Sequence, residues 1–424
     1  MNEIKEIGGG VCAPRGFRAG GICCGIKVSS RKRDLALIYS EKLCTAAAVF
    51  TTNKVRAASV LVSQEHIAKG ALRAIIANSG NANACTGEAG LAAARKMAEL
   101  AADLFAINPR QVAVASTGVI GVPLPIAAIE SGIEGLGNSL RGDEAGHAAA
   151  LEAIMTTDTH KKEWAVEVEI DGRPVRIGGM TKGSGMIHPN MATMLCFITT
   201  DVAITREALD SCLRGAVRRS FNRLTVDGDT STNDTVIVMA NGEAGNALIA
   251  AGSPGYDLFA LALESLCVKL SRDMARDGEG ATKLVTVTVS GAESEGAAET
   301  LAKAVASSSL VKAACFGADA NWGRVLCAMG YSGADFDPGE VDVSFVSFDE
   351  SHSGFDESHS GAREEISVCR GGASLPFSEE DAKRILSRAE IEIRVRAGKG
   401  PGTAAAWGCD LTYDYVRING DYRS

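Results

Sequence analysis

The chain has 424 residues, of which 46% are hydrophobic and 22% charged, and its formal net charge is −9. This is the composition of an ordinary globular protein, long enough for two or three units that share cores. The acidic balance argues against nucleic acid and anionic membrane as main partners. No apolar run approaches the roughly 20 residues of a membrane helix, and residues 1–7 lack signal-peptide features, so we expect a cytoplasmic protein.

The twelve cysteines do not indicate a metal site. Cys23 and Cys24 are adjacent, but no pair has the CxxC spacing by which zinc sites usually show themselves. In a cytoplasmic protein we therefore expect most of them to be small buried hydrophobic residues, and we predict no metal.

The first half of the chain alternates short apolar runs with loops rich in Gly, Asn and Thr. Thr86 is a candidate N-cap for the helix that follows it, and Asn108-Pro109 ends that helix. A glycine loop directly after a strand either aims backbone N–H groups into a site or is a plain turn into a helix. Strands are predicted at 35–39, 46–50, 72–77 and 111–115, loops at 78–83 and 116–123, a helix at 143–155, and a hairpin at 164–177 around Asp171-Gly172.

The stretch 182–201 combines two patterns that conflict locally. Residues 182–192 contain Gly183, Gly185 and Pro189 and favour a shaped turn, whereas 194–199 form an apolar, β-prone run typical of a buried strand. Thr193 lies at the joint between them. It is either part of an ordinary connector into the core or a hydroxyl held for attack.

The second half contains further candidate sites. The acidic segment 225–234 superficially resembles a calcium loop but lacks the EF-hand glutamate, so a hydrogen-bonded polar turn is the better interpretation. Residues 348–361 are a tandem copy of Phe-Asp-Glu-Ser-His-Ser-Gly, which we interpret as a duplicated surface loop rather than a metal site. Helices are predicted at 206–219, 256–274, 299–313 and 379–388, strands at 235–239, 284–289 and 391–395, a glycine loop at 276–283, and a C-terminal tail at 407–424 that packs back on the body.

Several common enzyme classes lack their motifs here. No GxGxxG opens a helix after a first strand, no Walker sequence is present, and no G-x-S-x-G elbow occurs. The irregular alternation of strands and helices, with hairpins, also excludes a simple parallel βαβ array. A threonine can still be a nucleophile without histidine if its own amine is the base, which requires cleavage of the Ala192–Thr193 bond.

The run 182–195, Lys-Gly-Ser-Gly-Met-Ile-His-Pro-Asn-Met-Ala-Thr-Met-Leu, resembles the self-cleavage site of the ornithine acetyltransferase (glutamate N-acetyltransferase) family of arginine biosynthesis. The resemblance extends over nearly the whole chain and follows the family's order. The duplicated segment 348–361 is a departure from the family pattern. The matching segments are 116–121, 156–159, 225–235, 276–283, 319–324 and 415–424.

The resemblance implies a mechanism. Thr193 would cleave the chain after Ala192 and then carry the acetyl group from N2-acetylornithine to glutamate in a ping-pong reaction. Thr117 and Gly118 match the oxyanion-hole positions. The substrate-binding positions of the family match Thr157, Lys182, Thr193, Glu279, Asn419 and Ser424. Lys182 suits an α-carboxylate and Glu279 an ammonium group.

The resemblance also implies an architecture and partners. The fold expected is mixed α/β, a layered sandwich of sheet and helices with a second α/β lobe. Cleavage would give an alpha chain, 1–192, and a beta chain, 193–424, which share a core and assemble as an α2β2 heterotetramer. No cofactor is expected, and whether acetyl-CoA is a further donor stays open.

Two other functions compete with this one. An N-terminal-threonine amidase or aminopeptidase would use similar self-cleavage chemistry but release acetate. A non-catalytic binding protein that retains a dead fold would leave the chain uncut.

Overall fold

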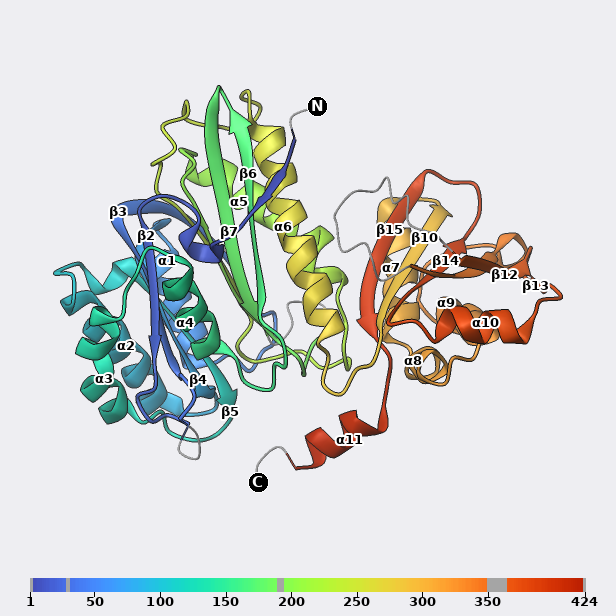
Figure 1. Ribbon diagram of the computed structural model, residues 1–424, viewed down its shortest axis with the longest axis horizontal. Helices are drawn as coiled ribbons and strands as arrows, with labels where there is room; N and C mark the ends of the chain where they lie inside the picture. Colours follow the sequence, from blue (N-terminus) through green and yellow to red (C-terminus); the bar gives the residue numbers. More distant parts are fainter. Residues whose placement is uncertain (1–2, 28–30, 189–193, 349–363, 422–424) are drawn as a thin grey trace. The chain divides into compact units, whose positions relative to one another are not determined.

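The computed structural model describes residues 3–27, 31–188, 194–348 and 364–421. The chain forms two compact units. In Figure 1 the first runs from blue to yellow along the chain, and the second is mostly orange and red. Ala192, Thr193, Ser424 and all of the duplicated segment except Phe348 lie outside the described residues. The first unit spans 1–186, 190–222 and 229–270, and the second spans 187–189, 223–228 and 271–424.

Within the described residues, the first unit is built on a nine-stranded sheet of order β1-β6-β7-β8-β9-β3-β4-β5, with β2 also paired to β3. The pairs β4–β5 and β8–β9 are parallel, whereas β3 pairs antiparallel with β2, β4 and β9. The strands are β1 (Lys5–Ile7), β2 (Phe17–Ile22), β3 (Leu35–Phe50), β4 (Ala71–Asn81), β5 (Val112–Val119), β6 (Lys162–Ile170), β7 (Arg173–Lys182), β8 (Leu195–Thr200) and β9 (Thr235–Ala240).

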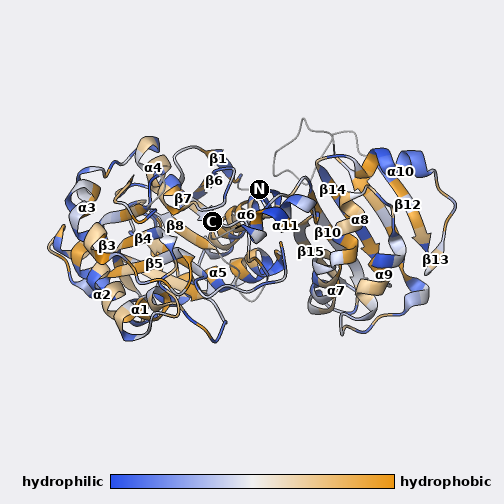
Figure 2. Cartoon of the chain, turned by 90° about the horizontal axis from the view of Figure 1, so that it is seen from below, coloured by the Kyte–Doolittle hydropathy of each residue, from blue (hydrophilic) through white to orange (hydrophobic). Residues whose placement is uncertain are grey.

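Helices cover both faces of this sheet because its strands are apolar on both sides. Leu35 and Leu37 pack with the first three helices on one face, and Ala36 and Ile38 pack with α4 on the other, as the period of two along a strand requires. Figure 2 colours β3, β4 and β5 largely orange. The helices of this unit are α1 (Ala58–Ile67), α2 (Gly87–Asp103), α3 (Ile126–Asn138), α4 (Glu144–Ile154), α5 (Arg206–Arg219) and most of α6 (Tyr256–Arg276).

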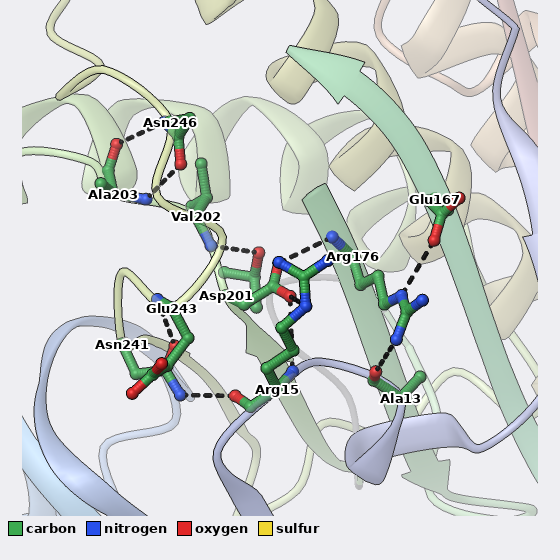
Figure 3. A network of polar contacts seen from close by, with 11 residues as sticks. Ala13, Arg15, Glu167, Arg176, Asp201, Val202, Ala203, Asn241, Glu243 and Asn246 are labelled. Carbon is green, nitrogen blue, oxygen red and sulfur yellow. Dashed lines mark hydrogen bonds and ion pairs between the residues drawn. The ribbon is translucent and has the colours of Figure 1, made fainter. Parts of the chain in front are cut away.

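Strand β8 is held between β7 and β9 and anchored at both ends by buried carboxylates. Its first paired residue, Leu195, lies opposite Lys182 of β7. Just past its last residue, the fully buried Asp201 accepts hydrogen bonds from the backbone N–H groups of Arg176, at 2.8 Å, and Arg15, at 3.4 Å (Figure 3). At the start of the strand, the N–H of Met194 donates to Asp234 Oδ1 at 3.0 Å. The segment that follows Thr193 is therefore fixed by both neighbours.

The second unit has its own sheet and core. Its strand order is β13-β12-β11-β14-β10-β15, and α7 packs on β10 and β15 through residues such as Leu301 and Val287. The strands are β10 (Leu284–Ala292), β11 (Asp342–Ser347), β12 (Glu364–Arg370), β13 (Ala373–Ser374), β14 (Glu390–Arg396) and β15 (Gly402–Cys409). The helices are α7 (Glu295–Ser307), α8 (Ser309–Phe316), α9 (Trp322–Gly330), α10 (Glu379–Leu386) and α11 (Tyr413–Gly420).

Several predicted boundaries are wrong. The loops expected at 78–83 and 116–123 begin as strand, because β4 and β5 continue their parallel pairing to Asn81 and Val119. The two strands expected at 35–39 and 46–50 are one strand, β3, with a register shift between them. The helix expected at 299–313 is two helices, since Ser308 ends α7 and its hydroxyl caps α8. Thr86 occupies the N-cap position of α2 without a side-chain hydrogen bond.

The fold class itself is confirmed. Both units are mixed α/β, and the first is a sandwich in which helices lie on the two faces of a sheet. The division into alpha and beta chains at residue 192 is a different matter, because the two compact units do not follow that boundary.

Truncation of the core side chain in β8 should unfold the first unit more easily. Phe197 is fully buried among residues of β3, β9 and α4, so Phe197→Ala should lower the free energy of unfolding by about 3–5 kcal/mol. Leu261 on α6 is 56% exposed, and Leu261→Ala should change it by less than about 0.5 kcal/mol. Chemical denaturation of both variants measures the difference, and equal stabilities would contradict this account of the core.

Candidate functional site

The ends of β4 and β5 meet through two glycines. Gly118 lies opposite Gly80 in the register, with φ of +135° and +93° respectively. A Cβ on Gly118 would lie 2.3 Å from the Gly80 carbonyl carbon and 2.5 Å from the Asn81 nitrogen. Only glycine permits this approach. The glycine loop predicted after 111–115 is thus a closely packed strand end that presents Thr117 and Gly118.

The polar segment before β9 fixes this strand end. Asn233 donates from Nδ2 to the carbonyl oxygens of Ala82 and Ser116, both at 2.7 Å, and is 4% exposed. Its neighbour Asp234 accepts, through its own carbonyl, the N–H of Thr51 at 3.0 Å. These bonds make 231–234 the hydrogen-bonded turn that we preferred over a calcium loop.

Lys182 connects the end of β7 to the strand end of β5. Its Nζ donates to Thr117 Oγ1 at 3.4 Å, and the residue is 3% exposed. A buried ammonium beside a hydroxyl and a glycine turn concentrates positive charge and hydrogen-bond donors in one place. Such a place suits a carboxylate or a developing oxyanion.

Asp158 compensates the buried lysines. It accepts hydrogen bonds from Lys162 Nζ at 2.6 Å and from the Gly183 N–H at 2.7 Å, and its side chain is fully buried. Burial by itself would raise the pKa of Asp158, but Lys182, Lys162 and the Thr156 N–H outweigh it and hold that pKa well below its usual 3.8. Thr157, half-buried, lies in the same turn. The carboxylate therefore ties this turn to the start of the glycine segment after β7.

The second unit contains the other predicted substrate-binding residues. Asn419 on α11 donates from Nδ2 to Glu279 Oε2 at 2.8 Å. The hydroxyl of Thr412, which caps α11, donates to the Gly280 carbonyl at 2.7 Å. A Cβ on Gly280 would lie 2.8 Å from Asp414. The C-terminal tail is thus fastened to the glycine loop 276–283, as the sequence predicted.

The structure groups the predicted site residues in two sets. Thr117, Gly118, Thr157 and Lys182 belong to the first unit, and Glu279 and Asn419 to the second. Sequence reasoning missed two buried carboxylates, Asp158 and Asp234, although both lie inside quoted motifs. The signal that could have found them is an acidic side chain within an otherwise apolar or small-residue context.

Two other findings bear on ligands and membranes. Over the described ranges of the chain, no group of three or more His, Cys, Asp or Glu side chains is arranged to hold a metal ion. Among the same residues, no helix is long and apolar enough to cross a membrane.

Comparison with known proteins gives consistent matches. The model of the ArgJ family matches residues 18–424. The arginine biosynthesis bifunctional protein ArgJ of Symbiobacterium thermophilum is 51% identical over 422 residues, which cover 99% of this chain and 100% of that protein. The crystal structure of arginine biosynthesis bifunctional protein argJ from Bacillus halodurans is 43% identical, with a TM-score of 0.47, and covers 53% of this chain and 97% of that one. The crystal structure of ornithine acetyltransferase complexed with ornithine from Mycobacterium tuberculosis is 37% identical, with a TM-score of 0.41, and covers 46% of this chain and 100% of that one.

Removal of the Asp158 charge should destabilise the first unit. Asp158→Asn leaves Lys162 and Lys182 buried without this carboxylate, which should cost about 3–5 kcal/mol at neutral pH. Because the folded-state pKa lies below the unfolded value of 3.8, the stabilisation by Asp158 is complete above that value and is lost as the pH falls through it towards the folded pKa. The variant should lack this part of the acid dependence. Denaturation curves recorded between neutral and acidic pH test this.

The matched control is Glu169→Gln, on an exposed position of β6, which should change stability by less than about 0.5 kcal/mol. An Asp158→Asn protein with wild-type stability at neutral pH would contradict the role assigned to the carboxylate.

Proposed function

The chain belongs to the ArgJ family and is an acetyltransferase of arginine biosynthesis, and we propose that Thr193 is the nucleophile of the transfer. The observation that carries this proposal is the cluster at the start of β8. Lys182, paired with Leu195 across β7 and β8, donates to Thr117 on β5. A cation, a strand end with close glycines and the segment that follows Thr193 are thereby joined in one buried region of the first unit.

Self-cleavage is the first proposed step. Thr193 Oγ attacks the carbonyl carbon of Ala192, the bond from that carbon to the Thr193 nitrogen breaks, and the proton of the hydroxyl passes to the nitrogen. Water hydrolyses the resulting ester, which restores the hydroxyl and leaves Ala192 with a carboxylate. The products are the alpha chain 1–192 and the beta chain 193–424, with a free α-amine on Thr193. Because β7 and β8 pair across this bond, the chains stay associated after it is cut.

Acetyl transfer follows in two half-reactions. The α-amine of Thr193 takes the proton from Oγ, which attacks the acetyl carbon of N2-acetylornithine and releases ornithine, leaving an acetyl-threonyl ester. The amine of glutamate then attacks the ester, so that N-acetylglutamate leaves and the hydroxyl is restored. Since one product departs before the second substrate reacts, the kinetics are ping-pong.

The other site residues serve binding and charge stabilisation in this proposal. Thr117 and Gly118 stabilise the tetrahedral oxyanion, which fits their position beside Lys182. Lys182 suits the α-carboxylate that both substrates carry, and Glu279 suits an ammonium group. Asn419, hydrogen-bonded to Glu279, orients that carboxylate. Thr157 and Ser424 complete the substrate-binding residues.

We also propose a second donor, an assembly and a compartment. The relative from Symbiobacterium thermophilum is named bifunctional, which supports acetyl-CoA as a further acetyl donor to glutamate and no bound cofactor. The assembly we propose is an α2β2 heterotetramer, and the compartment is the cytoplasm. Incubation of cut protein with acetyl-CoA and glutamate separates bifunctional from monofunctional activity, because only the former yields N-acetylglutamate from these two reactants.

Removal of the Thr193 hydroxyl should abolish both cleavage and transfer. Wild-type protein should give two bands, near the masses of 192 and 424 − 192 = 232 residues, and Thr193→Ala a single uncut band on a denaturing gel. Thr193→Ser keeps a hydroxyl and should still cut. Two bands from Thr193→Ala would refute the nucleophile assignment, and acetate in place of N-acetylglutamate from cut wild type would favour an amidase.

A methyl group on Gly118 should impair the oxyanion hole. Gly118→Ala forces Gly80 and Asn81 away from β5, and displaced donors lower the rate of acyl transfer by about 10²–10³-fold. Gly121 also has a positive φ, of +80°, but a Cβ there meets nothing within 4 Å. Gly121→Ala should therefore retain most activity. Initial rates with labelled glutamate, measured on folded and cut protein, compare the two, and a Gly118→Ala enzyme with the wild-type rate would contradict this role.

A further inference from the structure

Asp234 carries a buried oxygen atom for which the uncut chain offers no donor. The side chain is fully buried immediately before β9. Oδ1 accepts the N–H of Met194 at 3.0 Å, whereas Oδ2 has no hydrogen-bond partner. Leaving a polar atom in this state costs about 1–3 kcal/mol, and more if the group is charged. Such an atom in a native protein requires an explanation.

The surroundings of Asp234 do not supply one. The hydroxyl of Thr51, which lies nearby, donates to the Ser231 carbonyl at 2.7 Å. Burial raises the pKa of Asp234 well above 3.8, and the Met194 N–H, the Thr51 hydroxyl and the charge of Lys182 oppose it only in part. Lys182 is the charged group that acts on this carboxyl. The site thus disfavours a carboxylate as long as no further donor arrives.

Self-cleavage creates such a donor on the neighbouring residue. The atom bound by Oδ1 is the amide nitrogen of Met194, which is bonded to the carbonyl carbon of Thr193. The nitrogen of Thr193 is separated from it by three covalent bonds of about 1.3–1.5 Å each. Before cleavage that nitrogen is an amide, and after cleavage it is an amine with several N–H donors. A carboxyl group has two oxygens on one carbon, so it can bind both nitrogens at once.

We propose that Asp234 is a positioning residue for the nucleophile, and that its Oδ2 accepts a hydrogen bond from the α-amine that cleavage frees on Thr193. The inference rests on the proposed function, since the uncut chain has no amine at this residue. When the amine takes the proton of Thr193 Oγ, it becomes an ammonium, and the Asp234 carboxylate stabilises it. In return, the ammonium compensates the buried carboxylate.

The pH dependence of acetyl transfer tests this role. A base must be unprotonated to act, so kcat falls on the acid side as the amine gains a proton. Asp234→Asn keeps an oxygen for the Met194 N–H but removes the negative charge that favours the ammonium. The acid limb should therefore move to lower pH by about 1–3 pH units, with reduced kcat at neutral pH and a smaller change in KM.

Asp201→Asn is the matched control. Asp201 is also fully buried, accepts backbone N–H groups and lies at the opposite end of β8. Loss of stability alone would lower the amount of active enzyme in either variant without moving the acid limb. We expect the limb to stay at its wild-type pH in Asp201→Asn. An acid limb that also stays in place in Asp234→Asn overturns the inference.

A second measurement covers the case in which Asp234→Asn fails to fold or to cut. Infrared spectra of protein labelled with ¹³C-aspartate compare uncut Thr193→Ala with cut wild type at neutral pH. The uncut protein should show the carbonyl stretch of a protonated buried carboxyl, and the cut protein should lack it because the new ammonium ionises Asp234. The same band in both proteins overturns the inference.

The two proposals fail in different ways. Wild-type protein that stays uncut overturns the proposed function and this inference together. Wild-type protein that is cut and active, but whose acid limb is the same in Asp234→Asn, overturns only the role of Asp234.

Discussion

The hydrogen bonding of β8 between β7 and β9 is the constraint on which the rest of the site depends. This strand begins just after the proposed cut, and its partners come from both sides of that cut: β7 precedes residue 192, and β9 follows residue 193. A backbone ladder in a buried sheet satisfies its polar groups only while all three strands are present. Cleavage at residue 192 thus breaks the chain where the sheet already holds both ends of the segment.

Buried charge is distributed around this strand in compensated groups. Asp158 binds Lys162 and lowers the cost of the buried Lys182 nearby. Asp201 closes the far end of β8 on backbone N–H groups. Asp234 is the exception, because one of its oxygens has no partner. That difference between similar carboxylates is the reason to give Asp234 a part in the chemistry rather than only in the fold.

Local sequence patterns predicted most elements but not where strands end. The helix at 206–219 and the hairpin around Asp171-Gly172 were predicted correctly, since amphipathic spacing and a turn dipeptide are local signals. The ends of β4 and β5 were missed, because they are extended by pairing between residues about forty positions apart. A run rich in Gly, Asn and Ser has no intrinsic preference for strand, and only a partner strand provides it.

The sequence by itself determined the family, the proposed nucleophile and the motifs that carry the site residues, because these are properties of residue identity and order. It could not determine which side chains compensate one another. That Lys182 lies against Thr117, that Asn233 holds β5, and that Asp234 binds the residue after Thr193 all depend on contacts between distant segments. Tertiary structure alone decided these pairings, since burial and hydrogen-bond geometry arise only when the strands are assembled. The turn first suggested by Gly183 and Pro189 thus gained its chemical environment from β5 and β9.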